Sequence, residues 1–379
     1  MASFDENLIR IQDQFVRGPL PDPFTMNDGT PVTDAAAWEQ RRKEMYASAV
    51  ELQYGTMPPE PEFLEVDWLD AAALIRNYRI TTGRKDHPVS FIMRVILPAQ
   101  DGKFPAIVDG DLCWRYAFDK EYIETVTGNG IAFVYFNRLE LAPDRDTDRS
   151  CGPLYRCYPE YTFRALGAWA WGYARCVDAL EKLGYIDMDN IAFSGHSRGG
   201  KTALLAGVLD ERAAIVNPND SGAGGAGCYR LNMTAIDEKG ELQRNETLAD
   251  LLRNFPFWFN PELAPYVGHE EELPFDEHFL KALVAPRILL ETEAASDIWA
   301  NPVGSWQTAM AAKEVYRFLG AEENLVLAYR PGYHQHAIHD LQLLVNVMKA
   351  RIAGTPLYED SFRLPFPASE PIFDWRSPV

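Results

Sequence analysis

A serine near the middle of the sequence has the neighbours that an activated nucleophile requires. Gly195, Ser197 and Gly199 fit the pattern G-x-S-x-G, in which a serine sits on a sharp turn between a strand and a helix. A short apolar segment, 190–193, precedes the pattern, and a stretch with helical periodicity, 199–209, follows it. A serine hydroxyl is a weak nucleophile until a neighbouring base accepts its proton. The pattern therefore predicts acyl-transfer chemistry at Ser197, assisted by the positive end of the helix dipole.

In this arrangement a carboxylate and then a histidine follow the serine along the chain. His334 lies just after a predicted strand, 324–328, so we expect it to be the base in preference to its neighbour His336. His196 and His278 are expected to pack against other residues or to form hydrogen bonds. His334 is therefore the predicted general base.

Two aspartates are candidates for the acid that orients this histidine. Asp297 follows the predicted strand 287–290, and Asp220 follows the predicted strand 213–216. A carboxylate at either place would hold the imidazole in the tautomer that accepts the serine proton. Asp297 is the preferred candidate, with Asp220 as the alternative or as a second contributor.

The elements that must position these residues alternate between strands and helices. Strands are expected at 89–97, 104–108, 130–136, 190–193, 213–216, 287–290 and 324–328, and helices at 161–183, 199–209 and 341–352. Unbroken apolar runs such as 130–136 are typical of strands buried on both faces. The alternation, together with the serine turn, predicts an α/β-hydrolase fold with a mainly parallel central sheet and helices on both faces.

Two segments depart from this alternation. Residues 1–65 are rich in proline and charge, with a helical stretch at 38–52, and are expected to be an extension packed on the core. Residues 66–379 are expected to form the hydrolase domain. Within it, residues 228–285 are predicted to be a helical, cap-like insertion.

The charge of the chain limits its partners. The formal net charge is −19, which disfavours nucleic acid and anionic membrane surfaces as partners. It would also repel an anionic small molecule, unless the negative group is masked as an ester. No apolar run approaches the roughly 18 residues of a membrane helix. With 47% hydrophobic residues, the chain can still bury a large core.

The N-terminal sequence and the cysteines predict a location. No basic segment followed by an apolar run is found at the start, so no signal peptide is expected. The number of cysteines is odd, and none of the pairs has the spacing of a zinc site. These features predict reduced thiols and a cytoplasmic protein, with a mature secreted form as the alternative. Neither a cofactor nor a metal is expected. The cysteines are Cys113, Cys151, Cys157, Cys176 and Cys228.

The residues around the predicted site resemble the glucuronoyl esterases, carbohydrate esterase family 15. The similarity extends from about residue 18 to residue 352. Its most specific segments are 195–204, 221–230, 297–302 and 330–334. Members of this family cleave esters between an alcohol and the carboxyl group of glucuronic acid or its 4-O-methyl derivative. The resemblance implies a small-molecule or oligosaccharide uronate ester as substrate.

The resemblance also implies roles for individual residues. Ser197 would be the nucleophile and His334 the base, while Arg198 would stabilise the oxyanion together with backbone N–H groups. Lys201 would bind sugar hydroxyls, and Trp299 would form a wall of the sugar site.

The sequence departs from the fungal members of the family at the acid and at the sugar site. The family places its acid at either of two positions, which here hold Asp220 and Asp297. Fungal members have a glutamate where Asp220 stands, and their sugar-binding glutamine corresponds to Glu246. The alcohol and the exact uronic acid therefore stay open.

Three other functions agree with parts of the sequence. An acetyl or other carbohydrate esterase would use the same chemistry on a different acyl group. A non-catalytic relative would bind a ligand without turnover, which the intact set of Ser197, Asp297 and His334 disfavours. The glycines of 222–227 also fit the dinucleotide pattern G-x-G-x-x-G, but a capped helix start does not follow them. A tight loop that lines the pocket is the preferred interpretation of these glycines.

Overall fold

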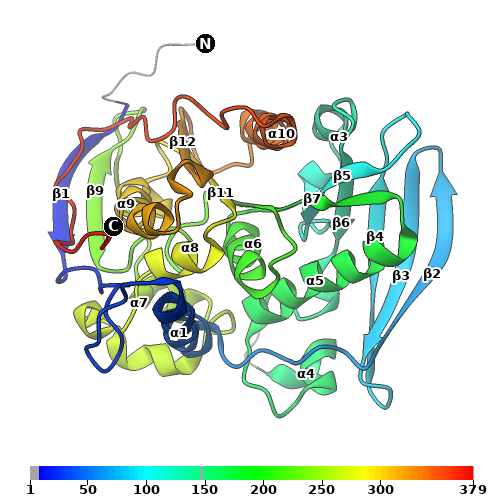
Figure 1. Ribbon diagram of the computed structural model, residues 1–379, viewed down its shortest axis with the longest axis horizontal. Helices are drawn as coiled ribbons and strands as arrows, with labels where there is room; N and C mark the ends of the chain where they lie inside the picture. Colours follow the sequence, from blue (N-terminus) through cyan, green and yellow to red (C-terminus); the bar gives the residue numbers. More distant parts are fainter. Residues whose placement is uncertain (1–7, 146–147, 379) are drawn as a thin grey trace.

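A computed structural model describes residues 8–145 and 148–378. A nine-stranded mixed sheet crosses the molecule, and Figure 1 shows it with helices on both faces. In spatial order its strands are β12 (Leu325–Arg330), β11 (Ile288–Ala294), β8 (Ile215–Asn219), β7 (Ile186–His196), β5 (Phe104–Asp109), β6 (Ala132–Phe136), β4 (Pro88–Ile96), β3 (Ile75–Gly83) and β2 (Phe63–Ala72).

The larger part of the sheet, which carries the site, is parallel. β12, β11, β8, β7, β5 and β6 run in the same direction, whereas β4, β3 and β2 add an antiparallel edge. The carboxyl ends of parallel strands meet at one edge of the sheet, where α/β proteins bind their ligands. The turn after β7 and the loops after β8, β11 and β12 are therefore neighbours. The prediction of an α/β-hydrolase fold is confirmed.

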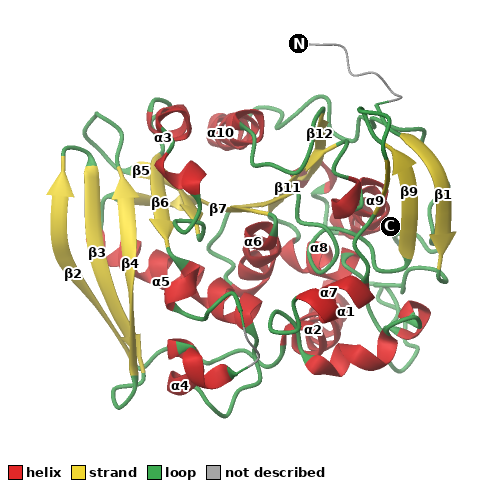
Figure 2. Cartoon of the chain, turned by 180° about the vertical axis from the view of Figure 1, so that it is seen from behind, coloured by secondary structure: helices red, strands yellow, loops and turns green. Residues whose placement is uncertain are grey.

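Separate hydrophobic clusters cover the two faces of this sheet. Figure 2 shows α3 (Lys120–Thr127) and α10 (Ile338–Ala353) on one side, and α5 (Ala165–Leu183), α6 (Arg198–Leu209) and α8 (His278–Val284) on the other. The first side buries α10 residues such as Leu344 and Met348, and the second buries most of α5. Because both faces are covered, strands such as β6 are fully buried, as their unbroken apolar sequence predicts.

A second, antiparallel sheet lies beside β12, and it was not predicted. It joins β1 (Arg10–Val16), β9 (Leu231–Ile236) and β10 (Leu242–Arg244), so the N-terminal extension supplies a strand to the 228–285 insertion. That insertion is thus only partly helical. β1 is mostly exposed and polar, so it lacks the alternation that would predict a strand, and backbone pairing with β9 fixes it instead.

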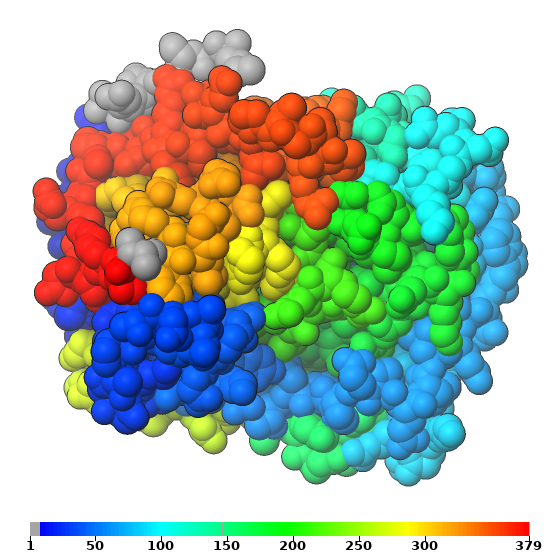
Figure 3. Space-filling view, viewed as in Figure 1, coloured from blue at the N-terminus to red at the C-terminus, as the bar shows by residue number. Residues whose placement is uncertain are grey.

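The rest of the N-terminal extension packs on the core with the C-terminal segment. α1 (Ala35–Tyr46) begins at Asp34, whose carboxylate accepts a hydrogen bond from the N–H of Ala37. Figure 3 shows the N-terminal segment in dark blue beside the C-terminal segment in red. The indole of Trp375 donates to the carbonyl of Leu20 at 2.9 Å, which ties the two segments together.

The remaining elements are short, apart from one long helix beside β12. That helix is α9 (Pro302–Phe318), which packs on α8. The shorter elements are α2 (Leu52–Tyr54), α4 (Pro153–Cys157), α7 (Leu248–Asn254), one π-helical turn (Ala47–Glu51) and 3₁₀ turns at Arg115–Phe118, Arg138–Glu140, Arg149–Cys151, Pro261–Tyr266, Glu270–Glu272, Ile298–Ala300 and Glu322–Asn324. Across the described residues, none of the helices combines the length and the apolarity needed to cross a bilayer.

Candidate active site

Ser197 occupies a strained turn between β7 and α6. Its backbone has φ 59° and ψ −121°, outside the conformations that a residue with a side chain readily adopts. Such a conformation costs about 1–3 kcal/mol and persists only when its surroundings enforce it. A Cβ on Gly195 would collide with the backbone of Gly199, and a Cβ on Gly199 would collide with the carboxylate of Asp111. The two glycines of the pattern are therefore needed for this close approach.

His334 and Asp297 complete a hydrogen-bonded chain from the serine. Nε2 of His334 lies 2.9 Å from Oγ of Ser197, and Nδ1 lies 2.5 Å from Oδ2 of Asp297. Asp297 is buried, and it follows β11 in the loop to α9. With Nδ1–H donating to a carboxylate, Nε2 is left to accept the serine proton. This geometry is that of a serine nucleophile with its general base.

Asp220 lies next to this chain but does not contact the histidine. Its Oδ1 accepts a hydrogen bond from the N–H of Ala294 at 2.5 Å, and its Oδ2 accepts one from Arg330 at 3.1 Å. Carboxylate oxygens of Asp220 and Asp297 and a ring nitrogen of His334 lie within 4.8 Å of one another. Burial, with the neighbouring Asp297 as second cause, raises the pKa of Asp220 well above its usual range. Of the two candidate acids, the structure gives the contact with His334 to Asp297.

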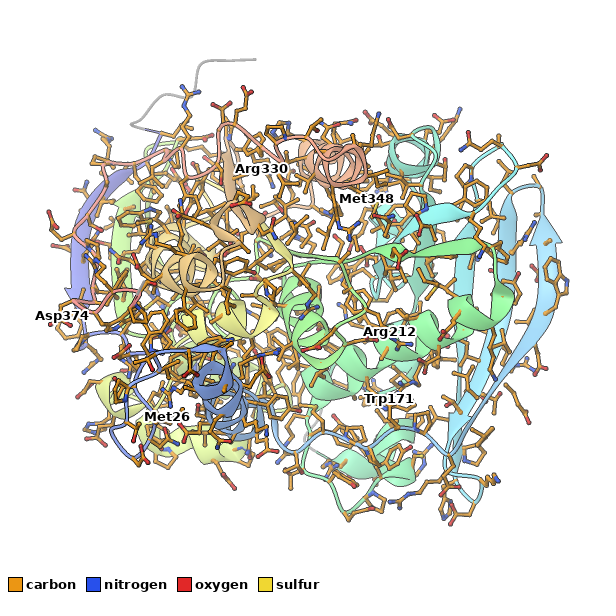
Figure 4. All side chains as sticks on the ribbon, in the orientation of Figure 1. Met26, Trp171, Arg212, Arg330, Met348 and Asp374 are labelled. Atoms are coloured by element: carbon orange, nitrogen blue, oxygen red, sulfur yellow. The ribbon has the colours of Figure 1, made fainter. Side chains whose placement is uncertain are left out.

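Arg330, at the end of β12, connects Asp220 with the loop that carries His334. Its Nε donates to both oxygens of Asp340, at 2.8 and 2.9 Å, and its Nη2 donates to the carbonyl of Gln335 at 2.5 Å. Figure 4 labels Arg330 between β12 and α10. The guanidinium therefore fixes the loop on both sides of the histidine.

The other histidines near the serine have structural contacts. Nδ1 of His196 lies 2.6 Å from the amide oxygen of Asn219, and its ring centroid lies 4.6 Å from that of His334. His336 is buried against Tyr116, with ring centroids 4.9 Å apart. His334, and not its neighbour His336, is therefore the histidine that contacts the serine. His278, farther away, is buried with its Nε2 at 2.8 Å from the carbonyl of Pro21.

His336 gives a prediction for stability in acid. Burial lowers the pKa of His336 to about 4, so the folded protein keeps the ring neutral, while the unfolded chain protonates it near pH 6.5. Between these values the unfolded state binds the extra proton, so stability falls as the pH falls. Between pH 7 and pH 5 the free energy of unfolding should fall by about 2 kcal/mol less in His336→Phe than in the parent protein. Urea denaturation of both proteins at the two pH values measures this, and an equal loss in the variant would contradict it.

Arg198, the first residue of α6, is held at the mouth of the site. Its Nη1 donates to Oδ2 of Asp144 at 2.5 Å, and its guanidinium carbon lies 4.9 Å from the ring centroid of Trp258. The rings of Phe255 and Trp114 lie 5.5 and 5.8 Å from the same carbon. A guanidinium fixed beside the nucleophile is suited to stabilise an alkoxide that forms there.

A cavity of about 180 Å³ opens at the serine. Its lining includes Ser197, Arg198, Lys201, Asp220, Ser221, Gly222, Glu246, Phe255, Trp258, Trp299, Ala300 and His334. Asp297 contacts the side of His334 that faces away from Ser197 and is not in this lining. Every other residue predicted for the site lines the cavity. A larger cavity of about 870 Å³ includes Ala214, Ile288 and Leu325, at the amino ends of the strands and thus at the opposite edge of the sheet. The smaller cavity is the candidate site because it contains the nucleophile.

Lys201 borders the cavity, but other groups already occupy its ammonium. Its Nζ donates to the carbonyls of Ser221 and Ala223, both at 2.5 Å, and lies 3.4 Å from Oε2 of Glu246. An ammonium group has three donors, so these contacts use its full capacity. Burial raises the pKa of Glu246, and Lys201 opposes that rise. In this structure Lys201 therefore holds the loop and Glu246 in place.

Trp299 forms one side of the opening and is 40% exposed. The guanidinium of Arg244 lies over its ring at 5.3 Å, and Arg244 is paired with Asp250 at 2.6 Å. The sequence reasoning did not find Arg244, Asp144 or the aromatic residues around Arg198. The run Phe255-Pro-Phe-Trp258 was the available signal for the aromatic residues, because three aromatic residues crowd into one short segment of the predicted insertion.

The glycine-rich segment 222–227 forms a tight loop. The N–H groups of Gly225 and Gly227 both donate to the carbonyl of Gly222, and the chain continues into β9. A dinucleotide fingerprint opens a helix, so this segment does not meet that requirement. The interpretation as a pocket-lining loop is confirmed. All five cysteines are free thiols, as predicted.

Comparisons with known proteins agree on one family. The family model described as glucuronyl esterase, fungi, matches residues 80–320. A 4-O-methyl-glucuronoyl methylesterase 1 of Wolfiporia cocos is 33% identical over 320 residues, which cover 83% of this chain and 73% of the relative. A 4-O-methyl-glucuronoyl methylesterase of Schizophyllum commune is 32% identical, over 86% of this chain and 79% of the relative.

Solved structures agree with these matches. A carbohydrate esterase family 15 glucuronoyl esterase from Caldicellulosiruptor kristjansonii has a TM-score of 0.83 and 30% identity, and the match covers 99% of this chain and 100% of the other. The glucuronoyl esterase catalytic domain from Hypocrea jecorina has a TM-score of 0.76 and 26% identity, over 97% and 98% of the two chains. The chain belongs to the glucuronoyl esterase family, carbohydrate esterase family 15, and is a carboxylic ester hydrolase.

Proposed function

We propose that this enzyme hydrolyses esters of glucuronic acid or a closely related uronic acid, with Ser197 as nucleophile, His334 as base and Asp297 as the acid. The continuous hydrogen-bonded chain from Ser197 Oγ to Asp297 carries the proposal. A relative from Sporotrichum thermophile has been solved in complex with methyl 4-O-methyl-β-D-glucopyranuronate; it is 27% identical, with a TM-score of 0.74, and the match covers 94% of this chain and 93% of that one. The family therefore supports a uronate ester as the substrate class.

The reaction follows from the geometry in two halves. His334 takes the hydroxyl proton while the oxygen of Ser197 attacks the ester carbonyl, and Arg198 stabilises the negative oxygen that forms. The bond to the alcohol then breaks, and the imidazolium gives its proton to the departing alcohol. A uronoyl ester of Ser197 remains. Water, deprotonated by the same imidazole, attacks this ester and releases the uronic acid with the serine restored.

The negative charge of the protein favours release of the product. The substrate is uncharged at the carboxyl group while it is esterified, so the acidic protein does not repel it. The product is a carboxylate, and a chain with a net charge of −19 repels it. The second candidate function, an acetyl or other carbohydrate esterase, would use the same triad and releases a carboxylate as well.

The choice between these substrates is tested by comparing rates. Methyl and benzyl glucuronate should be hydrolysed with a higher kcat/KM than acetylated xylose or acetylated glucose. Ser197→Ala serves as the blank for background hydrolysis of each ester. Turnover of the acetylated sugars without turnover of either uronate ester would reject the uronate assignment and leave the serine mechanism in place.

Trp299 gives a prediction for recognition of the sugar. Its exposed ring at the opening can pack on the face of a sugar ring, a contact worth about 1.4 kcal/mol, which is tenfold in kcat/KM. Trp299→Ala should therefore lower kcat/KM for methyl glucuronate by about tenfold. Hydrolysis of p-nitrophenyl acetate, which has no sugar ring, should change little. Trp68→Ala is the matched control, because Trp68 is 56% exposed on β2, away from the cavity lining. An unchanged kcat/KM for the uronate ester in Trp299→Ala would contradict this role.

We also propose a cytoplasmic location and a small-molecule or oligosaccharide ester as the partner of the site. The free thiols of all five cysteines are compatible with a reducing compartment. Fractionation of cells that express the natural gene, followed by immunodetection, tests the location, and recovery from the medium would reject it.

A further inference from the structure

Asp144 joins the guanidinium of Arg198 to the indole of Trp258. One carboxylate oxygen, Oδ2, accepts from Nη1 of Arg198 at 2.5 Å, and the other, Oδ1, accepts from Nε1 of Trp258 at 2.7 Å. The side chain of Asp144 is 16% exposed, so the ion pair is partly shielded from water. Asp144 lies in the loop after the 3₁₀ turn Arg138–Glu140, far along the chain from both partners.

The aromatic rings around Arg198 make this arrangement rigid. Trp258 is buried, and its ring stacks on Phe255 with centroids 3.9 Å apart. Arg198 lies over both rings and near Trp114, so its guanidinium is bounded by rings as well as by the carboxylate. A side chain held in this way does not have to reorganise when charge develops beside it, which is the basis of electrostatic catalysis.

The Nε of Arg198 does not contribute to this arrangement. It is buried and has no hydrogen-bond partner among the residues that the structure describes. Arg198 lines the cavity with Ser197, so the exposed part of its guanidinium, and not the buried Nε, is what a bound ester can reach.

We propose that Asp144 is a positioning residue with two effects on the reaction. It holds Arg198 so that the guanidinium faces the oxygen that becomes negative during attack. It also balances the charge of Arg198, so that the released uronate, an anion, is bound only weakly. The inference rests on the proposed function, because it assumes a neutral ester as substrate and a carboxylate as product.

The two effects predict two separate changes in Asp144→Asn. This variant keeps the shape of the side chain but loses its charge and one of its two acceptor oxygens, so it cannot accept from both Arg198 and Trp258 and no longer holds the guanidinium in place. The kcat for methyl glucuronate should fall by at least about tenfold, up to the roughly 10²-fold to 10³-fold loss seen when an oxyanion donor is removed, with KM changed less than about twofold. The inhibition constant of glucuronate as product should fall by about threefold or more, because Arg198 is no longer neutralised. A residue with a merely structural role would not tighten the binding of the product.

A double-mutant cycle decides whether Asp144 acts through Arg198. In the Arg198→Met background, Asp144→Asn should change neither kcat nor the inhibition constant further. Glu160→Gln, which removes the charge of an exposed partner of Arg84 outside the cavity lining, is the matched control and should leave both constants unchanged. The cycle can be run with any ester that the parent enzyme turns over, so a wrong choice of substrate is distinguishable from a wrong role for Asp144.

Two results would overturn the proposal. One is an Asp144→Asn protein with the parent melting temperature, kcat and product inhibition. The other is an equal loss of kcat in the parent and in the Arg198→Met background. If Asp144→Asn does not fold, Trp258→Phe replaces the indole by a smaller aromatic ring and removes the N–H that donates to Asp144, and it should lower kcat with no change in product inhibition. Unchanged kcat in that variant would then reject the positioning role.

Discussion

Replacing Ser197 by alanine should lower kcat for a uronate ester by about 10⁴-fold to 10⁶-fold. The reason is that Oγ of Ser197 is the atom placed 2.9 Å from the imidazole, and a methyl group cannot form the acyl-enzyme. Alanine adopts the same backbone conformation at the same cost, so the melting temperature should stay within a few degrees, about the effect of 1 kcal/mol or less. Activity assays measure the fall in kcat, with the protein concentration determined by a method that does not depend on the active site. Thermal melts measure the melting temperature.

Ser221→Ala is the matched control for this loss. Ser221 lines the same cavity, but its Oγ accepts a hydrogen bond from the N–H of Ala226 at 2.9 Å and is not aligned with a base in the structure as described. Its removal should cost activity by less than about tenfold, the effect of one neutral hydrogen bond. Ser197→Ala protein that retains more than about one hundredth of the parent rate would contradict Ser197 as the nucleophile.

The two candidate acids should respond very differently to removal of their charge. Asp297→Asn should lower kcat by about 10⁴-fold, because an amide facing Nδ1 of His334 favours the wrong tautomer of the imidazole. Asp220→Asn should lower kcat by less than about tenfold, because the amide oxygen can still accept from the N–H of Ala294. Arg330 also keeps its contacts with Asp340 in that variant.

The pH profiles of the two variants add an independent readout. Asp297→Asn should change the pH dependence of kcat/KM on its acidic limb, since the imidazolium loses its carboxylate partner. Asp220→Asn should keep the parent profile. A loss in Asp220→Asn as large as in Asp297→Asn would show that the triad acid is shared between the two positions, contrary to the contact seen here.

The sequence allowed the nucleophile and the base to be predicted because their local patterns are specific. The G-x-S-x-G turn dictates a positive φ at Ser197, and the strand before His334 is a clear apolar run. The sequence favoured Asp297 as the triad acid but did not exclude Asp220. Their loops follow β8 and β11, which are adjacent parallel strands, so both carboxylates arrive at one place. Only the contacts of their side chains show which of the two carboxylates orients His334.

Other parts of the site could not be predicted from the sequence because they depend on contacts between residues far apart along the chain. Asp144 lies in a loop without periodicity, and its role follows from contacts with Arg198 and Trp258. Lys201 was expected to bind sugar hydroxyls, whereas two carbonyls of the glycine-rich loop and Glu246 occupy its ammonium. The strand β1 was missed for a related reason, since its polar sequence forms a strand only by pairing with β9.

Rapid acid quenching can show whether Ser197 carries the uronoyl group during turnover. The enzyme is mixed with benzyl glucuronate, quenched within the first turnovers, digested and analysed by mass spectrometry. A uronoyl adduct is expected on the peptide that contains Ser197, together with a burst of benzyl alcohol equal to the enzyme concentration when deacylation is slow. Ser197→Ala should show neither. An adduct on a different residue, or steady turnover in Ser197→Ala, would contradict this role of Ser197.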